Sequence, residues 1–397
     1  MNILFVEDSS NMGGVQESTL SLAENLINKK TYNINVLVPQ KGEISLRLDK
    51  KSIPFQFYKP VKYLSTSIDI LKSSYHIINP MALFYNLVAI IINSYRIKKL
   101  INRKNDFVVT KGLLNHFCTG FAVMNYKNIK LIWHLQDLIT SRHCGLARYV
   151  FNYFARIIPD KIICDGRLIQ KILDKNSKKK SIVILNGIKT KSFQRDTENG
   201  ENIRKEFNIP ENAYVLGHLG RITYWKGQLY LLKAFLEYVK HNDNAYLLLV
   251  GSPIFTNHKY MKSIVSLINK SEYKNNIKLT GYRTDLKDIF SAMDLFIYPS
   301  IEKDTTPLSL ISAMASGLPV VVSEIESLND IINLSPQIDT FKPKILKSLV
   351  YYMRKYEDES KRKMHAKSNI KIAKNYFDIE IHSKKMILLF NQMLASN

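Results

Sequence analysis

The stretch YPSIEKDTTPLSLISAMASGLPVV, residues 298–321, decides the fold class of this chain. An apolar strand runs into an acidic, hydroxyl-rich loop, which is followed by a helix of small residues, a Gly-x-Pro turn and a second apolar strand. Strand, helix and strand in this order are typical of a parallel sheet covered by helices. The loop begins where the first strand ends, and this is the edge at which such sheets bind ligands.

The same alternation of apolar strands and amphipathic helices extends through most of the chain. In the first half we predict strands at residues 3–6, 34–38, 54–58, 106–110, 130–133, 161–164 and 181–185. In the second half we predict strands at residues 214–219, 246–250, 277–279, 295–298 and 319–322. The pattern predicts an α/β protein with two doubly wound, Rossmann-like domains.

A polar, charged segment separates the two halves. We expect a first domain over 1–187, a linker over 188–212, a second domain over 213–375 and a C-terminal helix over 376–397 that packs back toward the first domain. Two such sheets facing each other would bring the carboxyl ends of their strands to a shared cleft, where we expect the ligand.

The charge of the chain is strongly basic. Its 397 residues include 57 Lys+Arg against 34 Asp+Glu, a formal net charge of +23, and 46% are hydrophobic, which excludes disorder as the main state. Residues 1–190 carry 28 basic and 12 acidic residues, a balance of +16, so most of the excess lies in the first half. Such a balance indicates nucleic acid, an anionic membrane surface or a phosphorylated ligand as partner.

The cysteines and the N-terminus bear on location. The three cysteines, Cys118, Cys144 and Cys164, form no C-x-x-C pair, so we expect neither disulfides nor a zinc site, and a reducing compartment. The segment MNILFVEDSSNMGG reaches acidic residues after a short apolar run, so it is interpreted as a first strand and not as a signal peptide. The longest apolar stretch, Met81–Tyr95, is interrupted by two asparagines and is expected to fall short of a bilayer span.

Two glycine turns are candidate phosphate sites. Gly13 and Gly14 follow the first strand and open a helix, so their backbone N–H groups could approach a phosphate; a tight turn without ligand is the alternative. Gly220, Arg221 and Lys226 follow the first strand of the second domain and precede a helix. A guanidinium fork, an ammonium and a helix N-terminus suit a diphosphate, whereas the alternative is two solvated surface cations.

Two further positions are candidates for chemistry. Asp304 follows a strand and its carboxylate could accept hydrogen bonds from sugar hydroxyls, unless it serves only to cap the next helix. His134 follows the strand 130–133 at its carboxyl end, although a lone histidine is usually structural. The histidines show no ligand spacing and there is no Asp-x-Asp pair, so no bound metal is predicted.

Taken in order, these segments resemble the GT-B fold glycosyltransferases, and more narrowly the retaining family 4, which uses nucleotide-activated sugars. The resemblance covers nearly the whole chain. It rests on the Gly-Gly turn, the His after a strand, Leu185-Asn186-Gly187-Ile188 with Phe193, the Gly-Arg…Lys-Gly turn, Val250-Gly251, Leu279-Thr280-Gly281-Tyr282 and Ala313-Met314-Ala315-x-Gly317-x-Pro319.

The resemblance implies a set of site residues. The implied donor-binding residues are Gly13, Gly14, Gly220, Arg221, Lys226, Tyr282, Asp304, Leu308 and Ser312. The implied catalytic residues are His134, Arg221, Lys226 and Asp304. In such an enzyme Arg221 and Lys226 would hold the donor diphosphate, Tyr282 would mark the strand end beside the nucleobase, and His134 would lie near the reacting sugar.

Two of these positions depart from the family pattern, which has glutamate at both. Asp304 keeps a carboxylate on a shorter stem, while Ser312 can bond a ribose hydroxyl only without charge. A charged hydrogen bond contributes about 1.5–3 kcal/mol against about 1 kcal/mol for a neutral one, so we expect the ribose contact to weaken. Glu302 could supply a carboxylate if the loop were reorganised.

The resemblance implies retaining transfer of a sugar from a nucleotide diphosphate donor to a hydroxyl of a lipid-linked or surface glycan, as in bacterial capsule, O-antigen or lipopolysaccharide biosynthesis. It implies no cofactor and no metal. The alternative is a catalytically degenerate homologue that acts as a nucleotide-sugar-binding or scaffolding subunit, which the serine at 312 favours.

The basic first half adds an expectation about location. The cationic run 96–104 beside the apolar segment 81–92 suits peripheral contact of a cytoplasmic protein with the anionic inner face of the cytoplasmic membrane. An ordinary buried helix with a solvated basic end is the alternative. Nucleic acid is not expected as a partner, because no reading helix, RNA-binding sheet or zinc module is recognisable.

Overall fold

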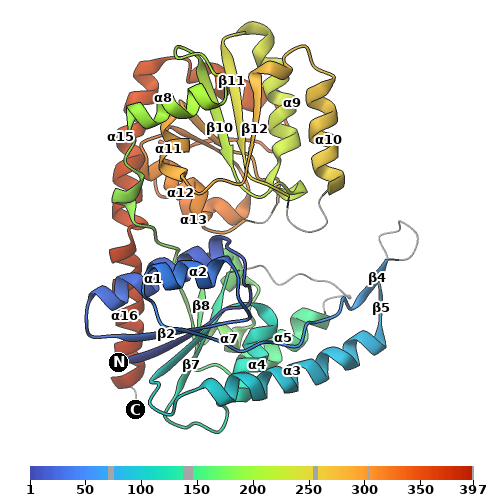
Figure 1. The fold of residues 1–397 in the computed structure, drawn as a ribbon, viewed down its shortest axis with the longest axis vertical. Helices are drawn as coiled ribbons and strands as arrows, with labels where there is room; N and C mark the ends of the chain where they lie inside the picture. Colours follow the sequence, from blue (N-terminus) through green and yellow to red (C-terminus); the bar gives the residue numbers. More distant parts are fainter. Residues whose placement is uncertain (70–75, 137–145, 254–257, 303, 396–397) are drawn as a thin grey trace. The chain divides into compact units, whose positions relative to one another are not determined.

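The computed structural model describes residues 1–69, 76–136, 146–253, 258–302 and 304–395 (Figure 1). The chain forms two compact units, which are Met1–Leu185 with His382–Asn397 (unit 1) and Asn186–Ile381 (unit 2). Each unit is built on a parallel sheet covered by helices, so the predicted α/β class with two doubly wound domains is confirmed.

In the described part of unit 1, seven parallel strands form one sheet in the order β3-β2-β1-β6-β7-β8-β9. These strands are β1 (Asn2–Val6), β2 (Asn33–Val38), β3 (Phe55–Phe57), β6 (Phe107–Thr110), β7 (Lys130–Leu135), β8 (Lys161–Cys164) and β9 (Ser181–Val183), and β4 (Ser67–Asp69) pairs separately and antiparallel with β5 (His76–Ile78). The helices are α1 (Gly14–Asn28), α2 (Glu43–Lys50), α3 (Pro80–Leu100), α4 (Leu113–Val123), α5 (Leu146–Ile157), α6 (Arg167–Lys171) and α7 (Lys175–Lys179).

The sheet of unit 1 is buried on both faces. Ile3 and Phe5 of β1 pack into one apolar cluster, while Leu4 and Val6 pack into another on the opposite face. Successive side chains of a strand point to opposite faces, so a strand with helices on both sides has to be apolar throughout. For this reason the first strand appears in the sequence as an uninterrupted apolar run.

The C-terminal helix α16 (Ile379–Ala395) completes the core of unit 1. Met386, Leu389 and Phe390 are buried in the same cluster as Ile3, and the rings of Phe107 and Phe390 have their centroids 4.6 Å apart. Residues nearly three hundred positions apart in the sequence therefore share one hydrophobic core.

Unit 2 repeats the doubly wound architecture. Its six-stranded parallel sheet has the order β12-β11-β10-β13-β14-β15. The strands are β10 (Tyr214–Leu219), β11 (Ala245–Val250), β12 (Ile277–Gly281), β13 (Leu295–Tyr298), β14 (Val320–Ser323) and β15 (Asp339–Phe341). The helices are α8 (Thr197–Glu206), α9 (Gln228–Tyr238), α10 (His258–Asn269), α11 (Leu286–Ser291), α12 (Leu308–Ala315), α13 (Asn329–Ile332), α14 (Leu346–Lys355) and α15 (Glu359–Tyr376).

The segment predicted as a linker, 188–212, folds as part of unit 2. It contains α8, whose N-cap Asp196 accepts a hydrogen bond from the N–H of Asn199. The backbone N–H of Asp196 also donates to Ser291 Oγ at 3.0 Å, and Phe193 packs edge-on against Phe290. The polar composition of this segment reflects a surface helix, whose capping side chain satisfies a free N–H group of its first turn.

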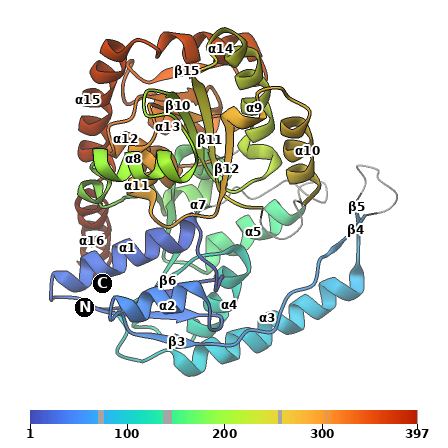
Figure 2. The same ribbon diagram turned by 45° about the horizontal axis from the view of Figure 1, so that its top comes forward.

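The expectation that two asparagines interrupt the apolar stretch Met81–Tyr95 and leave it shorter than a bilayer span was wrong with respect to length and composition. Helix α3 runs for 21 residues and is, among the described residues, the one helix long and apolar enough to cross a membrane, with 33% of its apolar window buried. Asn86 and Asn93 do not interrupt the helix, because their side chains bond the backbone of a neighbouring segment. Figure 2 shows α3 alongside α4 at the edge of unit 1.

Candidate functional site

In unit 2 the strand order reverses between β10 and β13, and ligands bind at the carboxyl ends of strands beside such a reversal. The loop with Gly220 and Arg221 follows β10, and the loop with Asp304 follows β13. The two loops are joined through their backbones, since the N–H of Ile301 donates to the carbonyl of Trp225 at 2.8 Å. Two segments that the sequence singled out separately therefore form one surface.

Glycines allow these loops to approach closely. Gly227 has φ +72°, and a Cβ there would lie 1.9 Å from the carbonyl oxygen of Pro299. Gly251, at φ +136°, would place a Cβ 2.0 Å from the carbonyl oxygen of Gly220. Both the backbone conformation and the space exclude any side chain, so the turns after β10, β11 and β13 are fixed backbone against backbone.

Lys226 and Asp304 meet in this site. The Lys226 ammonium forms an ion pair with the Asp304 carboxylate and donates a hydrogen bond to Tyr298 Oη at 2.7 Å. The same carboxylate oxygen accepts from Tyr298 Oη at 2.5 Å and from Ser300 Oγ at 2.9 Å. The side chains of Lys226 and Asp304 are only 12% and 16% exposed, so the pair is largely shielded from solvent. An anionic ligand that binds Lys226 would have to displace Asp304 or share the ammonium with it.

Arg221 is the exposed cation of the site. Its guanidinium forms no ion pair with any other residue that the structure describes, whereas its carbonyl accepts a hydrogen bond from Gln228 Nε2 at 2.7 Å. Gln228 also lies 3.4 Å from His218 Nε2, and His218 Nδ1 donates to the carbonyl of Ile297 at 3.0 Å. Burial lowers the pKa of His218 to about 4, so a neutral imidazole supports the backbone that carries Arg221.

Three other predicted donor residues, Tyr282, Leu308 and Ser312, lie in unit 2 as well, whereas Gly13 and Gly14 lie in unit 1. Tyr282 follows β12 and is 54% exposed, and Leu308 is the first residue of α12 and half-buried. Ser312, one turn further along α12, is buried with 3% of its surface exposed. Glu302 is exposed in the loop after β13. These positions remain predictions as donor contacts.

The loop that carries Asp304 is strained. Thr306 is buried and has φ +40°, a left-handed conformation that a β-branched residue seldom adopts. The N-cap of α12 is Pro307, which has no side-chain capping bond, so the alternative role of Asp304 as a cap of this helix is not what the structure shows. The carboxylate is held instead by Lys226, Tyr298 and Ser300. Strain held by surrounding contacts is a feature of ligand-binding loops.

In unit 1 the glycine turn opens a helix as predicted. Gly13 is the N-cap of α1, with an extended backbone and no side-chain cap, and Gly14 is the first helical residue. The carbonyl of Gly13 accepts the N–H of Glu17 at 2.9 Å. The N–H groups of the first turn are therefore not covered by a capping side chain, as a phosphate-binding helix N-terminus requires.

His134 was expected to follow its strand, and this was wrong. Strand β7 continues to Leu135, so His134 lies within the sheet and is 1% exposed. Its Nε2 donates to Asp165 Oδ1 at 2.5 Å, and Nδ1 has no hydrogen-bond partner among the described residues. Burial lowers the pKa of His134, which favours a neutral ring. The residue that follows the strand is Gln136, which donates to Asp165 Oδ2 at 2.8 Å.

A buried polar network at this edge of unit 1 was not predicted from the sequence. Lys111, at the end of β6, is 2% exposed and donates to Ser18 Oγ at 2.8 Å and to the carbonyl of Val15 at 3.1 Å. Burial raises the pKa of Glu7 and lowers that of Lys111, and each partly offsets the shift of the other. Burial opposes the charge of Asp165, but His134, Lys111 and Gln136 together hold its pKa below the usual value. Through the bonds from Lys111 to Val15 and Ser18, this network holds α1 against the sheet.

A known family matches the chain in sequence within unit 2, and known structures match its fold over both units. Residues 199–372 match the family described as glycosyl transferases group 1. The whole chain superposes on the crystal structure of Anabaena Alr3699/HepE in complex with UDP and glucose, with a TM-score of 0.82 and 19% identity over 100% of this chain and 99% of the other. The chain has the GT-B fold, and its residues 199–372 match the glycosyl transferases group 1 family.

The curated relatives of the chain are distant. The UDP-Gal:alpha-D-GlcNAc-diphosphoundecaprenol alpha-1,3-galactosyltransferase of Escherichia coli is 23% identical over 81% of this chain and 79% of its own length. The O-antigen biosynthesis glycosyltransferase WclY of Escherichia coli is 22% identical over 92% of both chains. A further structure of the same fold, sucrose-phosphate synthase from Thermosynechococcus elongatus, superposes with a TM-score of 0.75 and 16% identity over 100% of both chains.

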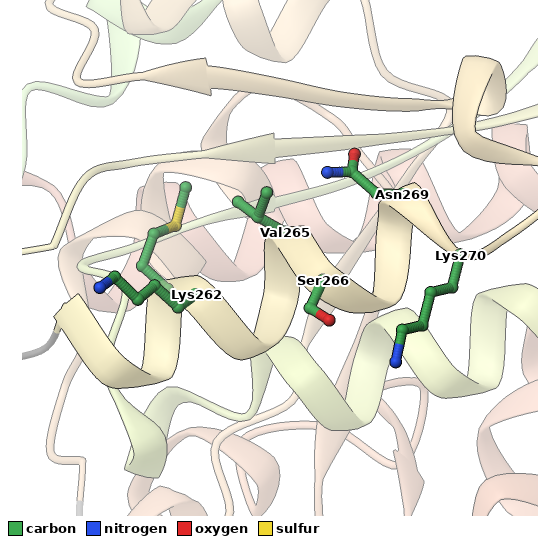
Figure 3. Close-up of a pocket in the computed structure, with 6 residues that line it drawn as sticks. Lys262, Val265, Ser266, Asn269 and Lys270 are labelled. Atoms are coloured by element: carbon green, nitrogen blue, oxygen red, sulfur yellow. The ribbon is translucent and has the colours of Figure 1, made fainter.

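Two surface hollows are lined by none of the predicted donor residues. One, of about 460 Å³, runs along α10 and is lined by Met261, Lys262, Val265, Ser266, Asn269 and Lys270 (Figure 3). Another, of about 530 Å³, lies beside α15. Among the described residues no group of three or more His, Cys, Asp or Glu could hold a metal ion. Cys118 and Cys164 are free and buried, while Cys144 falls outside the described residues.

Buried neutral histidines make the stability of the protein sensitive to acid. Burial lowers the pKa of His116 to about 3 and that of His382 to about 4. Because both values lie below the unfolded value of about 6.5, the unfolded chain binds more protons, and stability is lost as pH falls below that value. We expect the free energy of unfolding to fall by about 2 kcal/mol per histidine on going from neutral pH to about pH 5.

Urea unfolding across this pH range checks the expectation. His116 stacks on Trp133 with ring centroids 5.1 Å apart, so His116→Phe retains a ring there and removes one titrating group. The acid-induced loss should shrink by about 2 kcal/mol in His116→Phe. An equal loss in the unaltered protein and in His116→Phe would contradict the assignment.

Proposed function

We propose that this protein transfers a sugar from a nucleoside diphosphate sugar to a hydroxyl of a lipid-linked or surface glycan, with retention at the anomeric carbon. The observation that carries the proposal is the meeting of Lys226 and Asp304 beside exposed Arg221 at the strand-order reversal of unit 2. Cations suit a diphosphate and a carboxylate suits sugar hydroxyls, and here both lie on one surface.

The residues of the site suggest how the bond breaks. Negative charge grows on the diphosphate as the bond to the sugar breaks, so Arg221 and Lys226 would stabilise the transition state electrostatically. In that role they would replace a metal ion, and we propose that transfer needs neither metal nor cofactor. Asp304, held by Tyr298 and Ser300, would orient the sugar through its hydroxyls.

The relatives support the choice of substrates. The similar galactosyltransferase of Escherichia coli is named for a UDP-galactose donor and a diphosphoundecaprenol-linked acceptor, and the similar Anabaena protein was crystallised with UDP and glucose. We therefore propose a UDP-sugar as the first donor to test and a polyprenyl-diphosphate-linked sugar as the first acceptor. The proposed place of action is the inner face of a bacterial cytoplasmic membrane, in capsule, O-antigen or lipopolysaccharide synthesis.

A donor panel tests this proposal. Full-length protein is incubated with common UDP- and GDP-sugars and a short-chain, water-soluble diphospholipid-linked N-acetylglucosamine, with and without EDTA. Product formation with one donor, unchanged by EDTA and with the anomeric configuration of the donor seen by NMR, is the expected result. Inversion or EDTA sensitivity would refute the corresponding part.

A degenerate, non-catalytic homologue is the second candidate. The observation that favours it is Ser312, which is uncharged and buried where the family pattern has a glutamate. In that case a nucleotide sugar from the panel would raise the melting temperature without any product or free UDP being formed. Measuring both thermal shift and UDP release with each donor therefore separates the two candidates.

A further inference from the structure

Helix α3 of unit 1 buries small and polar residues and exposes large apolar residues. Its buried stripe consists of small or polar residues, namely Ala82, Asn86, Ala89, Asn93 and Ser94, with Ile97 at its end. Its large apolar residues face outward, and those at least 37% exposed are Met81, Leu83, Phe84, Tyr85, Leu87, Val88, Ile91, Ile92 and Tyr95. A helix that covers a protein core shows the opposite arrangement. The alternative of an ordinary buried helix is therefore wrong.

The two asparagines explain how this helix is held. Asn86 bonds both the N–H and the carbonyl of Leu64, at 2.8 and 2.9 Å, and Asn93 bonds both groups of Val61, at 2.7 and 3.0 Å. Seven residues of helix and three of extended chain each advance about 10 Å, so the segment 61–64 can run along the helix and be bonded at both ends. Polar contacts attach α3 to unit 1, which leaves its apolar side free.

The charges around this face indicate the kind of surface that covers it. Between residues 80 and 105 there is no acidic residue, but five cations lie at the C-terminal end, namely Arg96, Lys98, Lys99, Arg103 and Lys104. The Lys99 ammonium lies 4.4 Å from the ring centroid of exposed Tyr95. These cations form no ion pair with any other residue in the described part of the chain. Apolar side chains next to such cations and tyrosines complement an anionic lipid surface, in which the cations meet phosphates. A second copy would set like charges against each other.

We propose that α3 lies in the plane of an anionic membrane and inserts its outward apolar face into one leaflet. The inference rests on the proposed function, because a membrane-bound enzyme would reach a lipid-linked acceptor. At 21 residues the helix is about 31 Å long, enough to cross a bilayer. A spanning orientation would nevertheless carry the segment 61–64 and its Lys62 into the hydrocarbon, at a high energetic cost. Insertion to the depth of one helix face avoids that cost.

Flotation of the full-length protein tests this mode of binding. Vesicles of phosphatidylglycerol and phosphatidylethanolamine in equal parts are compared with vesicles of phosphatidylcholine. We expect the protein to float with the anionic vesicles, and the double variant Phe84→Ser/Ile91→Ser to bind at least about tenfold less. The matched control is Tyr351→Ser/Met364→Ser, which removes two side chains of similar exposure from unit 2 and should float like the unaltered protein.

A spectroscopic variant keeps the test independent of loss of binding. In Phe84→Trp, lipids brominated on the acyl chains near the headgroup should quench the added fluorescence more than lipids brominated near the chain ends, and in Tyr351→Trp neither should quench it. Unaltered flotation of Phe84→Ser/Ile91→Ser, absence of quenching in Phe84→Trp, or conversion of a dimer to a monomer by the serine pair would each overturn the proposal. The last result would show that α3 contacts a second copy.

The outcome can be separated from that of the proposed transfer reaction. With the water-soluble acceptor, Phe84→Ser/Ile91→Ser should turn over at the rate of the unaltered protein, because neither residue belongs to the donor site. With the acceptor embedded in anionic vesicles its rate should fall by about tenfold, in step with the loss of binding. If no donor is turned over, flotation and quenching still decide whether α3 inserts.

Discussion

Replacing Lys226 with alanine is expected to lower turnover of the donor sugar by about 10²–10³-fold, the usual effect of removing one group that stabilises charge in a transition state. The ammonium is held in place by Tyr298 and Asp304, so it is already positioned when the donor arrives. Arg221→Ala should lower turnover by a similar factor and, because Arg221 is exposed, should leave the free energy of unfolding unchanged. Release of UDP under donor saturation gives the rate.

Two comparisons make this result specific. Lys240→Ala removes an exposed lysine of unit 2 that pairs with Glu237, and its turnover should match that of the unaltered protein. Lys226→Ala also leaves the carboxylate of Asp304 without its cation, so Lys226→Ala/Asp304→Asn separates the lost ammonium from the unpaired charge. Near-normal turnover in both Lys226→Ala and Arg221→Ala would rule out the assigned role.

Replacing Asp165 with alanine should destabilise unit 1 by about 3–5 kcal/mol, the range found when one partner of a buried charged network is removed. Asp165 is 1% exposed and accepts hydrogen bonds from His134 and Gln136. Its loss would also remove a compensating charge from buried Lys111. The midpoint of urea unfolding, followed by tryptophan fluorescence of Trp133, measures the change.

The control for this variant lies at the other end of strand β8. Asp160 is exposed and accepts one backbone N–H, from Leu131 at 2.7 Å, so Asp160→Ala should cost only about 1 kcal/mol. Asp165→Asn keeps the shape and the acceptor oxygen, and we expect an intermediate cost. Equal effects of Asp165→Ala and Asp160→Ala would show that the buried network contributes no more than an ordinary surface bond.

Much of this architecture was predictable because the sheets are buried on both faces. An uninterrupted apolar strand such as Ile3–Val6 or Leu295–Tyr298 stands out in a sequence, and the structure has strands at both places. That Arg221 and Asp304 lie at the same edge of the sheet could be predicted from the topology alone, because both follow strands of a parallel sheet. That Lys226 and Asp304 bond each other did not follow, because it depends on side-chain directions that only packing determines.

Two predictions failed because they depend on tertiary contacts, which a sequence pattern does not show. Strand β7 includes His134 and Leu135 because these residues pair with Ile163 and Cys164 of β8, and sequence patterns do not show where a ladder ends. The length of the apolar helix α3 was underestimated because Asn86 and Asn93 resemble interruptions in a hydropathy pattern, whereas their side chains bond the backbone of Leu64 and Val61. Only the contacts of Asn86 reveal which side faces inward.

The return of α16 to unit 1 has a consequence for the order of events during synthesis. Unit 2 is an insertion within unit 1, whose core lacks Met386, Leu389 and Phe390 until the ribosome has translated α16. Unit 2 is contiguous in the chain and can fold as soon as Ile381 has emerged. Most of unit 1 is thus translated first, but its core is completed last. Until α16 has been translated, the apolar face of the sheet that α16 covers stays exposed and can be bound by chaperones.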